Sequence, residues 1–258
     1  MNESPLILLT NDDGIHSAGI KALHESLAKI AQVVVVAPLK QHSATGQSIT
    51  VFTPLKITEF HHDSHGTMYG VRGTPTDCVK IAIKTVLPRK PDIVMSGINR
   101  GENTGYNIIY SGTVAAAREG AMLGIPSAAI SLASPRYDDF SLSAHFGTII
   151  AKHLLTNTLP LYTLLNINIP ALPSDQVKEV RITRQGYTTH HEFYEETKDH
   201  SGTKHYWLAG KKHENGIHDD PSFDTTAIKH NAISVTPLHY QQTNDAFLNT
   251  LNSWNIEF

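Results

Sequence analysis

The chain has 258 residues, of which 40% are hydrophobic and 17% charged, an ordinary globular composition that excludes a disordered or fibrous protein. Its 21 Lys and Arg against 24 Asp and Glu leave a net charge of -3 with no basic run, so polymeric nucleic acid is not expected as a partner. The one cysteine, Cys78, cannot form an intrachain disulfide.

The N-terminus has no basic segment or small-residue cleavage site of the kind that marks a secretory signal. The longest aliphatic runs, such as Val33–Ala37, are far shorter than the roughly 20 residues that span a bilayer. We therefore expect a cytoplasmic protein with no membrane partner.

Strands and helices alternate along the first two thirds of the chain. Leu6–Leu9 is a continuous apolar run that predicts a strand buried on both faces, and it ends at the polar turn Thr10–Gly14. A helix with Ser17 as its N-cap and a second buried strand over Val33–Val36 follow. This order predicts a βαβ unit.

The same alternation continues to about residue 170. Thr74–Asp77 combines an N-cap, a proline and an acid, which predicts a helix that reaches about Leu87. A strand at Asp92–Ser96 then leads into a long loop and a helix that begins near Ser111. The remaining elements predicted here are a strand at Ser127–Leu132, a helix at Phe140–Leu155 and a strand at Leu161–Ile169.

This pattern predicts a three-layer, Rossmann-like α/β fold with a doubly wound, mostly parallel sheet. Residues 1–184 form the α/β unit, and residues 185–258 form an extended polar hairpin arm, a final strand at Ile233–Val235 and a terminal amphipathic helix. The second segment is not expected to fold independently. Ligands of doubly wound sheets bind beyond the carboxyl ends of the strands.

Two adjacent aspartates, Asp12 and Asp13, come directly after the first predicted strand. Carboxylates crowded in this way repel each other unless a cation lies between them. Ser43 and Asn99 follow other buried strands in loops that converge on the same edge, and their oxygens would complete a site for Mg²⁺ or Mn²⁺. The alternative is that Asp12 closes an Asx-turn and Asp13 is solvated, and spacing alone leaves both interpretations open.

A second candidate site is the helix start at Ser111, Gly112 and Thr113. Free backbone N–H groups at a helix N-terminus attract phosphate, although a plain N-cap is the commoner role of a serine such as Ser111 taken on its own. The preceding loop carries Asn99 and Asn103, which favours the phosphate interpretation. A cation site beside an anion-binding helix indicates phosphate ester hydrolysis.

Several common catalytic motifs are missing from the sequence. It contains no G-x-G-x-x-G dinucleotide fingerprint, no P-loop, no G-x-S-x-G nucleophile elbow and no H-E-x-x-H zinc motif. NAD-dependent chemistry, ATP hydrolysis by a P-loop and the commonest hydrolase and zinc-protease mechanisms are therefore disfavoured.

Four ordered motifs resemble those of the survival protein SurE family of 5′/3′-nucleotidases: Ile7–His16, Gly73–Val79, Pro91–Asn99 and Tyr110–Ala117. Further similarity at 165–170, 180–184 and 233–238 extends the resemblance over nearly the whole chain. The resemblance implies a metal-dependent, acid-phosphatase-like phosphomonoesterase that hydrolyses nucleoside 5′- and 3′-monophosphates, with activity on short polyphosphate in some members.

The resemblance also assigns residues to roles. It implies one divalent cation per subunit, Mg²⁺ or Mn²⁺, held by Asp12, Asp13, Ser43 and Asn99. Residues expected to act in catalysis are Asp12, Asn99 and Ser111. The phosphate contacts it implies are Asn11, Asn103, Ser111, Gly112 and Thr113.

Family members are dimers or tetramers that exchange C-terminal elements, so the segment 185–258 is expected to serve in homo-oligomerisation. Two positions depart from the family pattern. Ser222-Phe223-Asp224 stands where members often have Gly-Thr-Asp, and Arg100 stands where members usually carry a small residue. Arg100 lies beside the expected metal loop, so the departure bears on substrate preference.

Two possible attacking groups and two rival functions are distinguished. The attacking group is either a water molecule, which we favour because Asp12 is needed as a ligand, or Asp12 itself through an aspartyl-phosphate. A haloacid-dehalogenase type of phosphotransferase fits poorly, because it requires two aspartates separated by one residue. A non-catalytic nucleotide sensor would use the helix start and need no carboxylate pair.

Overall fold

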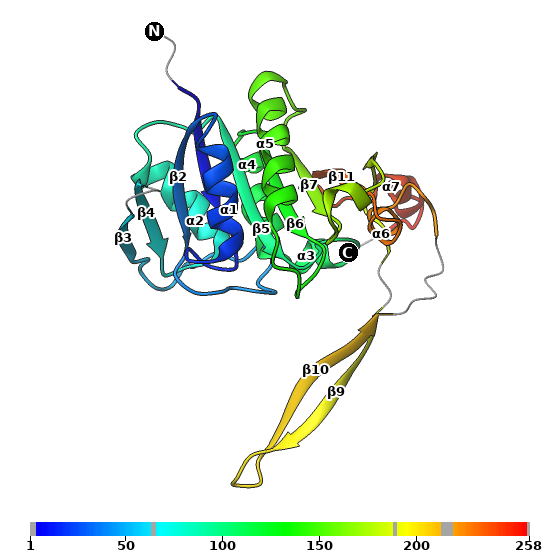
Figure 1. Ribbon diagram of the computed structural model, residues 1–258. Helices are drawn as coiled ribbons and strands as arrows, with labels where there is room; N and C mark the ends of the chain where they lie inside the picture. The colour runs from blue at the N-terminus through cyan, green and yellow to red at the C-terminus, as the bar shows by residue number, and fades with distance from the viewer. Residues whose placement is uncertain (1–3, 63–65, 188–189, 213–218, 257–258) are drawn as a thin grey trace.

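The computed structural model describes residues 4–62, 66–187, 190–212 and 219–256. One nine-stranded sheet runs through the body of the molecule, in the order β3-β4-β2-β1-β5-β6-β7-β11-β8 (Figure 1). Its strands are β1 (Leu6–Thr10), β2 (Gln32–Pro38), β3 (Ile57–His62), β4 (Gly66–Val71), β5 (Ile93–Arg100), β6 (Ser127–Leu132), β7 (Thr163–Ile169), β8 (Val180–Ile182) and β11 (Ile233–His239).

The sheet is mostly parallel, as the sequence predicts. Every pairing from β4 through β2, β1, β5 and β6 to β7 is parallel, whereas β3 against β4 and β7 against β11 are antiparallel. All five residues of β1 are buried, because the strand lies in the middle of the sheet between β2 and β5. The carboxyl ends of β1, β5 and β6 therefore meet at one edge.

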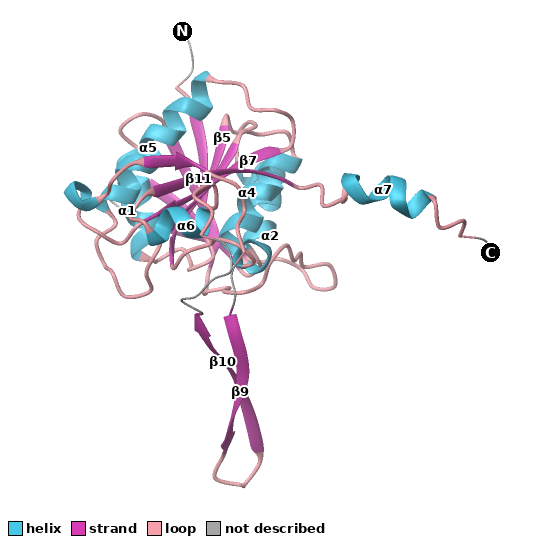
Figure 2. Ribbon diagram, turned by 90° about the vertical axis from the view of Figure 1, so that its right-hand side faces the viewer, coloured by secondary structure: helices cyan, strands magenta, loops and turns pink. Residues whose placement is uncertain are grey.

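Helices cover both faces of the sheet (Figures 1 and 2). On one face α1 (Ala18–Leu27) packs beside α5 (Ser141–Thr156), and on the other α2 (Pro75–Ile81) packs beside α4 (Gly112–Met122). Each pair encloses its own apolar core against the sheet. This arrangement confirms the predicted three-layer, doubly wound fold.

Shorter elements complete the body. The helix predicted from Thr74 to Leu87 is α-helical only to Ile81. A π-helical segment follows over Ala82–Val86. After it, the Leu87 N–H donates to the Ala82 carbonyl at 2.9 Å. The other short helices are α3 (Asn107–Tyr110), a 3₁₀ turn (Ser174–Gln176) and α6 (Asp224–Lys229). Across the described ranges, none of the helices combines the length and the apolar character needed to cross a bilayer.

The C-terminal segment leaves the body and returns to it. The predicted hairpin is present as β9 (His190–Lys198) and β10 (Lys204–Lys212), an antiparallel pair that projects away from the main sheet (Figure 1). The chain then re-enters the sheet as β11, which runs beyond the predicted Ile233–Val235 and lies between β7 and β8. The terminal helix α7 (Asp245–Asn252) lies apart from the body (Figure 2).

The packing of α1 on the sheet depends on Gly19. A Cβ atom at this position would lie 2.0 Å from the backbone carbonyl oxygen of Ile98, where neither backbone can give way cheaply. We predict that Gly19→Ala lowers the free energy of unfolding by about 3 kcal/mol through overpacking. Denaturant unfolding measures this change in the free energy of unfolding, and Lys21→Ala on the exposed side of α1 is the control. Equal stability of the two variants would contradict the described packing.

Candidate active site

The turn after β1 is organised by the side chain of Asn11. This side chain is fully buried, and its amide nitrogen donates to the Gly14 carbonyl (3.0 Å) and to Ser17 Oγ (2.7 Å), while its oxygen accepts the Gly14 N–H (3.2 Å). Gly14 has a φ of 98°, a conformation that favours glycine. Asn11 rather than Asp12 therefore closes this turn, whereas the phosphate contact expected of Asn11 stays a prediction.

Asp12 lies against the first turn of α4. The residue is 5% exposed, and its carboxylate accepts hydrogen bonds from the hydroxyl and the backbone N–H of Thr113. Gly112 makes this approach possible, because a Cβ there would lie 2.8 Å from Asp12 Cβ. Burial raises the pKa of Asp12 to about 6, since lost hydration outweighs the hydrogen bonds from Thr113, and the adjacent Asp13 raises it further.

Asp13 joins the other predicted metal ligands. One carboxylate oxygen accepts the Arg100 N–H at 3.1 Å, next to Asn99 at the end of β5, and the other lies 3.4 Å from Gln41 Nε2. The same Gln41 nitrogen donates to Ser43 Oγ at 2.9 Å. Partial burial raises the pKa of Asp13, although the N–H and the charge of Arg100 counteract this. Asp13, Ser43 and Asn99 thus come together at one edge of the sheet.

The donor atoms of this cluster fit a hard divalent cation. Asp12, Asp13, Ser43 and Asn99 offer two carboxylates, a hydroxyl and an amide, and the Asn99 amide nitrogen donates to the Gly101 carbonyl (2.8 Å), which leaves its oxygen for a ligand. In the described ranges no three His, Cys, Asp or Glu side chains form a group that could hold a metal ion. Mg²⁺ and Mn²⁺ accept such mixed oxygen sets, and a cation would offset the charge that two crowded carboxylates carry.

The helix start at Ser111 is built as an N-cap. Ser111 has an extended backbone, and its Oγ accepts the Val114 N–H at 3.1 Å. Gly112 and Thr113 are the first residues of α4, and the Thr113 N–H is directed to Asp12. The N-cap interpretation of Ser111 is therefore confirmed, and its expected role toward phosphate stays a prediction.

Asn103 is held by a buried polar network that sequence reasoning missed. Its N–H donates to Asn168 Oδ1 (2.7 Å), its carbonyl accepts from Asn166 (2.8 Å) and Asn168 (3.1 Å), and its own amide donates to Ser131 Oγ (2.8 Å). The signal in the sequence is a pair of asparagines two residues apart within an otherwise apolar strand, which places both on one buried face. The network fixes the loop after β5 to β6 and β7.

A second anchor missed from the sequence is Asp224, the first residue of α6. Its carboxylate is fully buried and accepts the N–H groups of Gly105 (3.1 Å), Gly186 (2.8 Å) and Thr225 (2.7 Å). Gln185 donates to the Gly105 carbonyl at 2.9 Å. Desolvation raises the pKa of Asp224, against the lowering effect of these three N–H groups. The base of the hairpin arm is thus fastened to the loop between β5 and α4.

Asp77 fastens the loop that carries Ser43. The predicted capping box is confirmed, because Asp77 Oδ2 accepts the Thr74 N–H (2.9 Å) and the Asp77 N–H donates to Thr74 Oγ1 (3.1 Å). The same carboxylate accepts the N–H (2.9 Å) and the hydroxyl (2.6 Å) of Thr50. Thr74 Oγ1 also donates to the Ser48 carbonyl at 2.7 Å. The sequence indicated the cap but not the connection to this loop.

Comparison with known proteins identifies this arrangement. The family model described as survival protein SurE matches residues 7–192. A protein of Syntrophobacter fumaroxidans named 5′-nucleotidase SurE is 41% identical over 97% of this chain and 99% of its own length. One of the same name from Symbiobacterium thermophilum is 43% identical over 98% and 99%.

A solved structure agrees with these sequence matches. The crystal structure of the SurE protein from Aquifex aeolicus superposes with a TM-score of 0.83 and is 39% identical over 96% of this chain and 99% of that one. The fold and the edge cluster define an α/β protein with an oxygen-rich site beside a helix N-terminus. The chain belongs to the survival protein SurE family, as its motifs predict.

The hydrogen bonds of Asp77 predict that the free energy of unfolding depends on pH in the acid range. Burial alone raises the pKa of Asp77, but the bonds from Thr50 and Thr74 outweigh it and hold the pKa below its ordinary value. Asp77 therefore stabilises the fold above its unfolded pKa of about 4, and this contribution is lost as the pH falls from that value through the lower pKa of the folded state. Asp77→Asn should cost about 2 kcal/mol at neutral pH and flatten the decline in unfolding free energy below about pH 5.

Denaturant unfolding between about pH 3 and pH 7 measures both effects. Asp175→Asn, which changes an exposed aspartate of the 3₁₀ turn, is the matched control and should keep the stability of the wild type. An Asp77→Asn profile parallel to that of the wild type would show that Asp77 does not hold this loop through its charge.

Proposed function

We propose that this protein hydrolyses nucleoside 5′-monophosphates to nucleoside and inorganic phosphate with the help of a divalent cation. The observation that carries the proposal is the position of Asp12, whose carboxylate is held at the N-terminus of α4 beside Asp13. Membership of the SurE family, whose curated relatives are named 5′-nucleotidases, supports the substrate class.

The residues that would hold the cation are Asp12, Asp13, Ser43 and Asn99. When bound, a divalent cation supplies positive charge to a phosphate oxygen. The chain itself prepares this site, because Gln41 links Asp13 to Ser43 and the Arg100 N–H orients Asp13. Mg²⁺ and Mn²⁺ are the ions that this set of oxygen donors favours.

The phosphate is bound in this proposal by the start of α4 and the loop before it. The Gly112 N–H and the Ser111 hydroxyl stabilise charge on the phosphate oxygens, and the partial positive charge of the helix terminus adds to this. The Ser111 N–H donates to the Asn107 carbonyl (3.0 Å) and the Thr113 N–H to Asp12, so Thr113 acts on the phosphate by positioning Asp12. The backbone of Asn103 is held by Asn166 and Asn168 and its side-chain amide donates to Ser131 Oγ, and we assign this residue a contact with the phosphate as the resemblance implies. Asn11 shapes the turn that carries Asp12.

Hydrolysis then proceeds by in-line attack. A water oxygen forms a bond to phosphorus, the ester bond to the nucleoside oxygen breaks, and the nucleoside oxygen takes up a proton. We favour water over Asp12 as the attacking group, because both the hydroxyl and the N–H of Thr113 already bind the Asp12 carboxylate. Asn99 and Ser111 complete the set of residues to which we assign catalytic roles.

We extend the proposal to 3′-monophosphates, short polyphosphate and oligomer formation, as the resemblance implies. Support for a homodimer or tetramer through exchanged C-terminal elements comes from apolar side chains exposed on the hairpin arm, on α7 and just after α7. They include Tyr194, Tyr206, Trp207, Leu208, Phe247, Leu248 and Trp254.

Asp12→Asn tests the proposed reaction. The amide keeps the shape of the side chain but removes a charge, so we predict a fall in phosphate release from 5′- and 3′-nucleoside monophosphates of roughly 100-fold or more. The assay compares Mg²⁺, Mn²⁺ and EDTA, and EDTA is expected to abolish release by the wild type. Asp175→Asn should retain full activity.

Two results would contradict the proposal. Release that is insensitive to both EDTA and Asp12→Asn would remove the carboxylate pair from the reaction. Tight nucleotide binding by the wild type in calorimetry without any turnover would instead favour the sensor, and Asp12→Asn would then bind nucleotide at least as tightly.

A further inference from the structure

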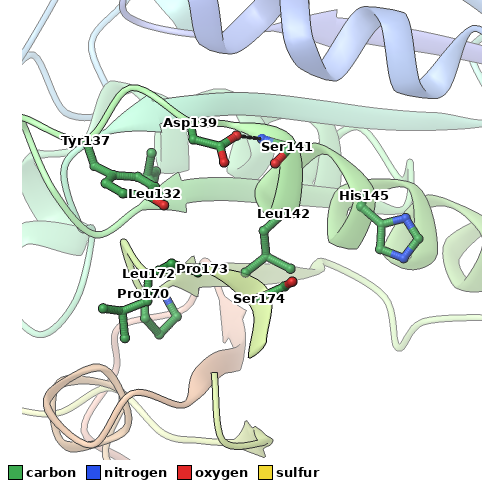
Figure 3. Close-up of a pocket in the computed structure, with 10 residues that line it drawn as sticks. All are labelled: Leu132, Tyr137, Asp139, Ser141, Leu142, His145, Pro170, Leu172, Pro173 and Ser174. Carbon is green, nitrogen blue, oxygen red and sulfur yellow. Dashed lines mark hydrogen bonds between the residues drawn. The ribbon is translucent and has the colours of Figure 1, made fainter. Parts of the chain in front are cut away.

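A pocket of about 410 Å³ lies beyond the carboxyl ends of β6 and β7 and next to the start of α5 (Figure 3). Its walls are largely apolar, formed by Leu132, Tyr137, Leu142 and Leu172. Polar groups come from Asp139 and Ser141 at the beginning of α5, from His145 further along α5 and from Ser174 (Figure 3). None of these residues has a role in the phosphate or cation sites described above.

The pocket is connected to the active site through the end of β5. Arg100, whose N–H binds Asp13, is paired in register with Leu132 of the pocket wall, and the Gly101 N–H donates to the Leu132 carbonyl at 2.9 Å. Adjacent strands lie about 4.8 Å apart. The pocket wall is thus one strand removed from Arg100, which binds Asp13 at the proposed cation site.

The side chain of Arg100 also holds the loop that forms one side of the pocket. Its guanidinium makes an ion pair with Asp138 at 2.6 Å and lies over the ring of Phe140, 5.5 Å from the centroid. These two residues alternate with Tyr137 and Asp139 of the pocket along the sequence. Arg100, which departs from the family pattern, therefore holds the loop beside this pocket with its side chain. Its backbone N–H binds Asp13.

The size and chemistry of the pocket match a heterocyclic base. Apolar walls with an aromatic ring and a few polar groups are typical of small-molecule sites, and this volume lies in the range of such sites. Asp139 Oδ1 accepts the Ser141 N–H at 2.8 Å. Hydrogen bonds from Ser141 hold the pKa of Asp139 below its ordinary value, so the group is an ionised, acceptor-only carboxylate at neutral pH.

We propose that this pocket binds the base of the nucleoside and that Asp139 selects bases with an exocyclic amino group. A carboxylate accepts hydrogen bonds from the amino groups of adenine, cytosine and guanine, whereas the carbonyl oxygens that flank the one N–H of uracil repel it. This inference rests on the proposed function, because it assigns a binding site to the nucleoside that hydrolysis releases.

Two variants test the pocket against substrates with and without a base. Leu142→Trp fills the space, and Asp139→Asn removes the charge but keeps an oxygen that can accept the Ser141 N–H. The substrates are AMP, GMP, CMP, UMP and ribose 5-phosphate, which has the same phosphate and sugar but no base. Asp175→Asn is the control, and calorimetry with adenosine and uridine adds a readout independent of turnover.

We expect Leu142→Trp to raise KM for all four nucleotides roughly tenfold or more and to weaken adenosine binding, with ribose 5-phosphate unaffected. Asp139→Asn should raise KM for AMP, GMP and CMP about fivefold with kcat retained, and should lower KM for UMP because the repulsion of the uracil carbonyl oxygens is removed. Unchanged KM values for nucleotides in Leu142→Trp, or an equal loss with ribose 5-phosphate, would overturn the assignment. Failure of the wild type to hydrolyse any of these substrates would instead contradict the proposed function, while adenosine binding would still report on the pocket.

Discussion

The burial of two adjacent acids, Asp12 and Asp13, is the constraint on which the site depends. Both carboxylates are drawn out of water, both have raised pKa values, and each is held by a group from a distant part of the chain: Thr113 for Asp12 and the Arg100 N–H for Asp13. A fold that forces two acids together in this way requires compensation by positive charge. The start of α4 supplies part of it, and a divalent cation would supply the rest.

The loops around this pair are fastened by carboxylates that do not belong to the site. Asp77 joins α2 to the loop that carries Ser43, and Asp224 joins the base of the hairpin arm to Gly105 in the loop between β5 and α4. Buried charges of this kind cost hydration and persist because several N–H and O–H donors satisfy them. The consequence is a set of site loops whose positions are tied to the core and to the C-terminal segment.

Most of the fold could be predicted from the sequence, because apolar runs such as Leu6–Leu9 and helix signals such as Thr74–Asp77 are local. The convergence of Asp13, Ser43 and Asn99 also followed from the rule that parallel strands end at one edge. What the sequence could not provide are contacts between distant segments. Asp224 lies 119 positions from Gly105. The pocket around Leu142 is formed by the loop after β6, by α5 and by the loop after β7. No local sequence pattern predicts either feature.

The central claim is that Asp12, Asp13, Ser43 and Asn99 share one cation next to the start of α4. Anomalous diffraction from crystals grown with Mn²⁺ and phosphate tests it most directly. The account predicts one manganese peak within coordination distance of these four side chains, with phosphate between the manganese and the start of α4. Two results would contradict it: a manganese peak elsewhere with none at Asp12 and Asp13, or phosphate bound away from α4.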